Sequence, residues 1–376
     1  MSERIGMIEV DFTLALHNRT GKYFIGRDII NANLGRIYQL RYWRLKGTPA
    51  EGPPLGLKAR IIGRLAVDEM RLRAMNPELR ALRLRPARVV LHLDPLTVLT
   101  HRLTRHDAVL CHDVGPLTHP ELFEPDVVAG YGEAYREIAE AGAHMVFVSK
   151  ASERAFHKAV PGRYSSSQVV YPSLRNEVGS GASTPLDIEK PFLLTVGYVG
   201  ARKNQLTAIR AFQQSGLAEK GFRYVICGGR EAGYEPVAQA AGQTPGVKLL
   251  SYVGDGELNW LYANAEGFVL PSLLEGFGVP VAEANRAGLV PIVSRDSVLE
   301  EVAGEGALAV NPLDCAEIAA AMQHLAFMPE SERQSRRAML AQSVARFSEE
   351  AFLAGWDRVT AEAAERSLVF AERQAA

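Results

Sequence analysis

Short apolar runs, each closed by glycine, proline or serine, recur along the chain with helix-like stretches between them, and this alternation limits the fold most. A strand that is buried on both faces of a parallel sheet is apolar on both sides, so such runs predict parallel strands covered by helices. In the first half we expect strands at 5–12, 88–94, 108–113, 145–149 and 169–171. In the second half, where the pattern is more regular, we expect strands at 192–197, 224–228, 247–252, 267–271, 290–294 and 308–310. The sequence therefore predicts an α/β protein with parallel sheets.

The stretches between these runs have the features of helices. Residues 204–215 carry apolar side chains on one stripe, as a helix that packs on a sheet does. Asp314 is followed three residues later by Glu317, and this spacing predicts a capping box that opens a helix at 316–327.

A chain of 376 residues is too long for one ordinary domain, so we expect two. A stretch rich in glycine, serine and proline, residues 179–190, is interpreted as the linker between them. The predicted N-terminal domain is then 1–178 and the C-terminal domain 191–346, and residues 347–376 form a final helix.

Composition excludes several classes of protein. The formal net charge is −1, so no overall positive field marks a nucleic-acid binder. The three cysteines are far apart in the sequence, which excludes a disulfide framework or a thiolate zinc site and fits a reducing compartment. The N-terminus has no uncharged core of a signal peptide, and no apolar run is long enough to span a membrane. We therefore expect a cytoplasmic protein.

One segment departs from this neutrality. Residues 58–88 contain three acidic residues against nine basic ones: Lys58, Arg60, Arg64, Arg71, Arg73, Arg80, Arg83, Arg85 and Arg88. Two interpretations stay open. The segment is either a solvated helical face or a patch that rests on anionic lipid at the inner face of a membrane, helped by Tyr42 and Trp43.

The most informative segment lies at 270–284, where a predicted strand is followed by a glycine-bearing turn and a helix. Gly276 and Gly278 let the backbone pass close to a ligand, and Pro280 suits the first turn of a helix. Free N–H groups and the positive end of the helix then point to one place, which favours phosphate. Glu275 and Glu283 beside a phosphate are better suited to accept hydrogen bonds from sugar hydroxyls. As simpler alternatives, Glu275 caps the turn and Glu283 only favours the helix dipole.

The string from Glu275 to Glu283 resembles the E-x(7)-E signature of the retaining glycosyltransferases of family 4, which have the GT-B fold of two facing Rossmann-like domains. The resemblance extends over nearly all of 191–327 and includes Arg202-Lys203-Asn204. In the first half it is sparser, with the string from His112 to Pro116 as its main feature, and residues 31–88 cannot be placed against it. The resemblance also implies that the final helix crosses back to pack on the N-terminal domain.

Roles follow from the resemblance, residue by residue. It implies that Arg202 and Lys203 bind the diphosphate of a nucleotide-sugar donor, that Glu283 holds the ribose, and that Glu275 binds a hydroxyl of the transferred sugar. The implied donor-binding residues are Arg202, Lys203, Tyr252, Val253, Gly276, Phe277, Gly278, Val279 and Glu283. The implied catalytic residues are His112 and Glu275. His112 is expected to contact the sugar, although a histidine at a strand end is often only hydrogen-bonded in place.

Two features depart from the family pattern. Many members have an arginine after the glycine of the first strand in the C-terminal domain, whereas Gly197 is followed here by Tyr198. The expected glycine-rich loop after the first strand of the chain is represented only by 21–27, where the two glycines are five residues apart.

The family implies a transfer with retention of configuration. No D-x-D motif is present, so we expect neither a metal nor another cofactor. The family resemblance favours mannose from GDP-mannose, moved to a glycan or lipid-linked acceptor in bacterial surface polysaccharide or lipopolysaccharide synthesis.

Four alternatives stay open: a transferase that uses a UDP-sugar, a nucleotide-sugar epimerase of the same fold, a binding module without activity, and a hydrolase. The last lacks a G-x-S-x-G motif, and Cys111 beside His112 is better interpreted as a buried thiol.

Overall fold

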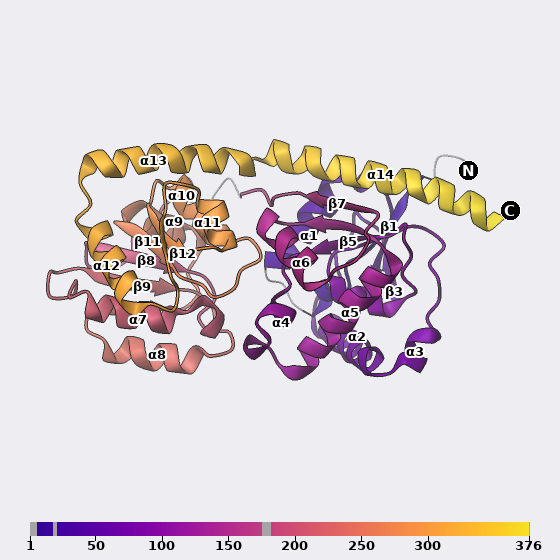
Figure 1. The fold of residues 1–376 in the computed structure, drawn as a ribbon, viewed down its shortest axis with the longest axis horizontal. Helices are drawn as coiled ribbons and strands as arrows, with labels where there is room; N and C mark the ends of the chain where they lie inside the picture. The colour runs from indigo at the N-terminus through magenta and orange to yellow at the C-terminus, as the bar shows by residue number, and fades with distance from the viewer. Residues whose placement is uncertain (1–5, 18–20, 175–181, 376) are drawn as a thin grey trace. The chain divides into compact units, whose positions relative to one another are not determined.

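The protein, described here from a computed structural model, divides into two compact units (Figure 1). Unit 1 consists of Met1–Pro172 together with Glu349–Ala376, and unit 2 is Ser173–Ser348. The structure describes residues 6–17, 21–174 and 182–375, with side chains to 370. The beginning of the predicted first strand, Ile5, and part of the predicted linker, 179–181, lie outside these residues.

Unit 1 is built on a seven-stranded sheet in the order β3-β2-β1-β4-β5-β6-β7. Its strands are β1 (Ile8–Asp11), β2 (Ile37–Tyr42), β3 (Leu45–Gly47), β4 (Val90–His92), β5 (Ala108–Cys111), β6 (His144–Phe147) and β7 (Ser166–Val169). All neighbours pair in parallel except β2 and β3, which form an antiparallel hairpin.

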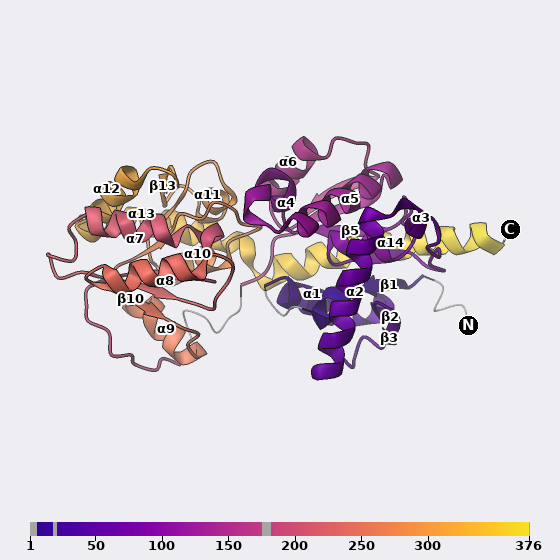
Figure 2. The ribbon, with the colours of Figure 1, turned by 90° about the horizontal axis from the view of Figure 1, so that it is seen from below.

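The helices of unit 1 lie on both faces of this sheet; Figure 2 shows α2 in front of the strands and α14 behind them. The α-helices are α1 (Gly21–Ala32), α2 (Leu57–Met75), α3 (Pro77–Ala81), α4 (Gly115–Thr118), α5 (Pro125–Ala141), α6 (Lys150–Ala159) and α14 (Glu349–Ala375). The 3-10 turns are η2 (Thr13–Leu16), η3 (Leu34–Arg36), η4 (Pro95–Thr100) and η5 (Pro120–Leu122).

Unit 2 is built on a six-stranded parallel sheet in the order β10-β9-β8-β11-β12-β13. Its strands are β8 (Phe192–Val196), β9 (Arg223–Cys227), β10 (Val247–Leu250), β11 (Gly267–Leu270), β12 (Pro291–Ser294) and β13 (Leu308–Val310). Figure 1 shows α7 and α8 on one side of this sheet, and α9, α10 and α11 on the other.

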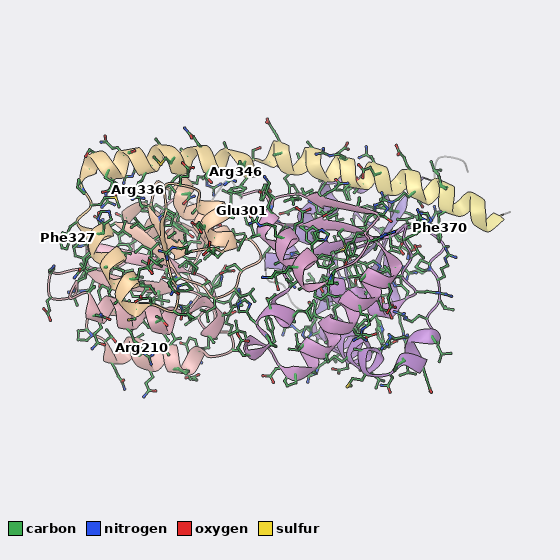
Figure 3. The ribbon with its side chains drawn as sticks, in the orientation of Figure 1. Arg210, Glu301, Phe327, Arg336, Arg346 and Phe370 are labelled. Atoms are coloured by element: carbon green, nitrogen blue, oxygen red, sulfur yellow. The ribbon has the colours of Figure 1, made fainter. Side chains whose placement is uncertain are left out.

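The helices of unit 2 are α7 (Gln205–Gln214), α8 (Tyr234–Gln243), α9 (Asp255–Asn264), α10 (Val279–Arg286), α11 (Val298–Ala303), α12 (Cys315–Ala326) and α13 (Glu330–Val344). Two 3-10 turns, η6 (Ala201–Lys203) and η7 (Ala345–Phe347), complete it. At the end of α13, Arg346 donates through Nη2 to the backbone oxygen of Glu301 in α11 at 2.8 Å, and both residues are labelled in Figure 3. Among the described helices, none combines the length and apolarity that crossing a bilayer requires.

Each predicted strand overlaps an observed one, although the prediction at 169–171 shares only Val169 with β7. Two other predictions were wrong in part. Residues 21–27 form the first turns of α1 rather than a glycine-rich loop. The capping box at α12 is only half formed: Asp314 accepts from the backbone N–H groups of Ala316 and Glu317, but the Glu317 carboxylate accepts from Asn311 instead of reaching back to Asp314.

Helix α14 packs within unit 1, against α1, η3 and β1. Phe352, Trp356 and Val359 form an apolar stripe along this helix and are buried, with Trp356 only 1% exposed. Thr360 Oγ1 donates to Asn33 Oδ1 at 2.7 Å, and Phe370, labelled near the far end of the helix in Figure 3, is also buried. The helix is therefore part of the core of unit 1.

We expect Trp356→Ala to destabilise unit 1 by about 3–5 kcal/mol, because it leaves a cavity where a large side chain is buried. The measurement is denaturant unfolding followed by circular dichroism. Leu353→Ala is the matched control, since Leu353 is on the same helix and 41% exposed. Equal stability of the two variants would contradict the packing of Trp356.

Candidate functional site

The sheet of unit 2 has a point at which its strand order reverses. From β8 the chain moves to β9 and β10 on one side, and then returns to β11, β12 and β13 on the other. In open parallel sheets, ligands bind outside the carboxyl ends of the strands at such a point. The loops that follow β8 and β11, residues 197–204 and 271–278, meet there.

Backbone and side-chain hydrogen bonds join these two loops. The N–H of Leu273 donates to the backbone oxygen of Arg202 at 2.9 Å. Asn204 donates through Nδ2 to the backbone oxygens of Pro271, at 3.0 Å, and Pro312, at 2.7 Å. Asn204 has a positive φ of 58°, a conformation that asparagine tolerates better than most residues. The Arg202-Lys203 pair is thus held against the loop that carries Glu275.

The charges of the two loops form a partly buried cluster. Lys203 Nζ donates to Glu275 Oε1, and Arg202 Nη1 donates to Glu275 Oε2 at 3.2 Å. Arg202 Nη2 also donates to Glu231 Oε2 at 3.2 Å. Ser272 Oγ donates to Glu275 Oε1 at 2.9 Å.

Lys203 and Glu275 are both nearly covered from solvent. Burial by itself would raise the pKa of Glu275, but Lys203 and Arg202 hold that pKa below its usual value, so the carboxylate is charged at neutral pH. The cluster therefore contains two cations, one of which, Arg202, keeps about a quarter of its side chain (28%) exposed.

Gly278 forms the N-cap of α10 with a φ of 91°, which favours glycine. A Cβ there would lie 2.3 Å from Leu299 Cδ2, so α11 also excludes a side chain. Pro280 is in the first turn, as the sequence predicts. Helix α10 thus begins directly after the Glu275 loop, and the N–H groups at its amino end are suited to bind an anion.

Glu283 lies in the second turn of α10 rather than in the first, and it is 7% exposed. The hydroxyl of Tyr262 in α9 donates to Glu283 Oε2 at 3.0 Å. Tyr262 is fully buried, so this bond fixes the carboxylate from inside the unit. Sequence reasoning missed Tyr262 as a positioning residue, since nothing in the sequence links α9 to α10.

Tyr252 and Val253 follow β10, at the same carboxyl edge but two strands away from β8. Tyr252 is 81% exposed. Within the described parts of the chain, no hydrogen bond or ion pair joins it to the charged cluster. Its expected contact with a base stays a prediction.

His112 follows β5 in unit 1 and is 4% exposed. Its Nε2 lies 3.1 Å from the backbone oxygen of Leu93, to which it donates. Burial, and then the charge of Lys22, lower the pKa of His112 to about 4, so its imidazole is neutral at pH 7. A neutral histidine suits hydrogen bonding to a hydroxyl, and its contact with a sugar stays a prediction.

The basic segment 58–88 is largely engaged within unit 1. Arg80 pairs with Glu133 at 2.6 Å and Arg83 with Glu137 at 2.7 Å, which fastens the residues around α3 to α5. Arg73 pairs with Glu69, Arg71 with Asp126, and the guanidinium of Arg85 lies over the ring of Phe370. The expected contribution of Tyr42 to a lipid-binding patch is wrong, because Tyr42 is 1% exposed.

In a comparison with known proteins, residues 182–340 match the family described as "Glycosyl transferases group 1". The chain is similar to O-antigen chain mannosyltransferase B of Escherichia coli, with 27% identity over 66% of this chain and 68% of the relative. It is also similar to O-antigen chain mannosyltransferase RfbU of Salmonella typhimurium, with 25% identity over 63% of this chain and 66% of that protein.

Among solved structures, the α,α-trehalose 6-phosphate synthase of Burkholderia multivorans has a similar fold, with a TM-score of 0.59 and 16% identity. The likeness covers 82% of this chain and 77% of that one. Both parallel sheets and the long helix α14 thus fit one known architecture. Residues 182–340 thus match the group 1 glycosyl transferases, and the chain has the GT-B fold.

Proposed function

We propose that this protein transfers a hexose, with retention of configuration, from a nucleoside diphosphate sugar whose diphosphate binds beside Arg202 and Lys203. The observation that carries the proposal is the charged cluster at the strand-order reversal of unit 2, next to the amino end of α10. Two cations and the positive end of a helix at one place offset the charge that develops on a departing diphosphate.

In this scheme Glu275 changes partners when the donor binds. Its carboxylate is paired with Lys203 and Arg202 in the ligand-free protein. A diphosphate carries more negative charge than one carboxylate, so it competes for both cations. The released Glu275 then accepts from a hydroxyl of the sugar, while Glu283, held by Tyr262, accepts from the ribose. The cations at the diphosphate make a divalent metal there unnecessary.

The names of the two relatives support mannose as the sugar, since both are O-antigen chain mannosyltransferases. We infer GDP-mannose as the donor and a glycan or lipid-linked acceptor in surface polysaccharide synthesis.

A panel of nucleotides tests the base. GDP is expected to raise the thermal midpoint of the protein more than UDP or ADP, without added divalent metal, because a ligand stabilises the state that binds it. Release of free GDP from GDP-mannose in the presence of acceptor then measures transfer. A shift with UDP alone would contradict GDP-mannose and leave the transferase proposal standing. A product that keeps its nucleotide would indicate an epimerase and contradict transfer.

We expect Lys203→Ala to lower kcat/KM for the donor by one to three powers of ten, or about 1.5–4 kcal/mol, because a charge at the leaving diphosphate is lost. The variant also leaves Glu275 with one cation fewer, so its fold is checked by circular dichroism. Lys220→Ala, which removes an exposed lysine of the same unit, is the control. Unchanged donor kinetics in Lys203→Ala would remove Lys203 from the site.

We also propose that unit 1 touches an anionic membrane, through the beginning of α2 rather than the whole basic segment. In this part Lys58, Arg60 and Arg64 are exposed. They alternate with exposed apolar side chains: Leu55 (72%), Leu57 (73%), Ile61 (52%) and Leu65 (51%). Basic and apolar side chains on one helical face are typical of a helix that lies in a bilayer interface.

Cosedimentation with vesicles checks this contact. Wild-type protein is expected to bind vesicles that contain anionic phosphatidylglycerol more tightly than neutral ones, and binding should weaken with salt. Replacing Leu57 and Ile61 with serine, and separately Lys58 and Arg60 with glutamine, should reduce binding several-fold. Arg210→Gln, an exposed arginine of unit 2, is the control. Binding that no variant changes would contradict this surface.

A further inference from the structure

Three buried side chains with metal-ligating atoms meet in unit 1. Asp11 at the end of β1 and His92 at the end of β4 are register partners in the parallel sheet. His101 follows η4. One ligand atom of each residue lies within 4.8 Å of those of the other two, and their exposed fractions are 2%, 0% and 4%.

Hydrogen bonds fix which nitrogen of His92 carries the proton. The hydroxyl of Thr97 uses its single hydrogen to donate to the backbone oxygen of Asp94 at 2.8 Å. It can therefore only accept from His92, whose Nδ1 lies 2.8 Å away. The proton is on Nδ1, and Nε2 of His92 carries a bare lone pair.

The same reasoning applies to His101. Thr100 Oγ1 donates to the backbone oxygen of Thr97 at 2.7 Å and so accepts from His101 Nδ1, 2.8 Å away. The Nε2 of His101 is again a bare lone pair. The rings of His92 and His101 stack with centroids 4.7 Å apart.

The two Nε2 atoms are buried and have no hydrogen-bond partner among the described residues. These two lone pairs and the Asp11 carboxylate, whose Oδ1 accepts from the N–H of Thr13 at 3.0 Å, belong to three residues whose ligand atoms lie within 4.8 Å of one another. Buried polar atoms without a partner are costly, and a cation at this place would satisfy the two nitrogens and the carboxylate together.

We propose that Asp11, His92 and His101 bind a zinc ion through the Asp11 carboxylate and the two Nε2 atoms. Imidazole nitrogen and carboxylate oxygen are ordinary zinc ligands, and ligating histidines typically donate their other N–H to an oxygen, as both do here to threonine. Ligand atoms about 2.1 Å from a tetrahedral zinc are about 3.4 Å apart, so the three ligand atoms would move closer together when the ion binds.

One of the three proposed ligands, Asp11, borders a cavity that neither histidine lines. Asp11 and Thr97 line a cavity of about 290 Å³ in unit 1, together with Lys22, Asp94 and Tyr131. Water from this cavity can supply a fourth ligand. A zinc there joins β1, β4 and the residues after η4, so its role is to stabilise the carboxyl edge of this sheet.

Metal analysis of the purified full chain tests the site. After dialysis against zinc and then against metal-free buffer, mass spectrometry of the elements is expected to find about one zinc per chain. His101→Ala should retain less than about a tenth of that, whereas His157→Ala, which removes an exposed histidine of α6, should retain it all. Wild-type protein without stoichiometric zinc, or equal zinc in both variants, would overturn the proposal.

A second variant keeps the test valid if His101→Ala does not fold. Asp11→Asn keeps the shape of the side chain and removes its charge, so its zinc affinity should fall about 10-fold or more. Cobalt in place of zinc is expected to give the visible absorption of a four-coordinate ion in wild-type protein and to lose it in this variant. Unchanged cobalt spectra and affinity in Asp11→Asn would exclude this ligand set. None of these readouts depends on sugar transfer.

Discussion

The direction of parallel strands determines where chemistry is possible in this protein. Because neighbouring strands run the same way, the loops that leave them gather at one edge, and the order reversals open that edge to a ligand. In unit 2 the reversal lies between β8 and β11, where Arg202, Lys203 and Glu275 meet. In unit 1 it lies between β1 and β4, where Asp11 and His92 are partners. Each unit therefore concentrates its buried polar groups at the corresponding place.

The pairing of Lys203 with Glu275 is a poor way to make a fold stable. Removing two charges from water costs several kcal/mol per ion, and apolar side chains of the same size often do as well or better. A buried pair is better explained by ligand binding, because each ion holds the other side chain in position until a ligand replaces one of them. Ser272 donates a further hydrogen bond to Glu275, and Glu231 accepts one from Arg202, the second cation beside Glu275.

Sequence reasoning reached most of the fold because the strands of both sheets are short, apolar and clearly bounded. It missed the edge strand β3 and its neighbour β2, where polar side chains such as Gln39 and Arg41 of β2 break the apolar pattern. The motif from Glu275 to Glu283 could be recognised because its residues are close together in the sequence. Tyr262 and the cluster of Asp11, His92 and His101 were not, because only the folded chain brings together residues so far apart in the sequence.

The return of α14 to unit 1 means that unit 2 is an insertion between two segments of unit 1. A ribosome makes residues 173–348 before it makes Trp356, which fills the core beside α1 and β1. Domains generally fold as units during synthesis, so unit 2 can fold while unit 1 still lacks α14. The unit that begins first is thus completed after unit 2, and its apolar surface under α14 stays exposed to other chains until that helix has been made.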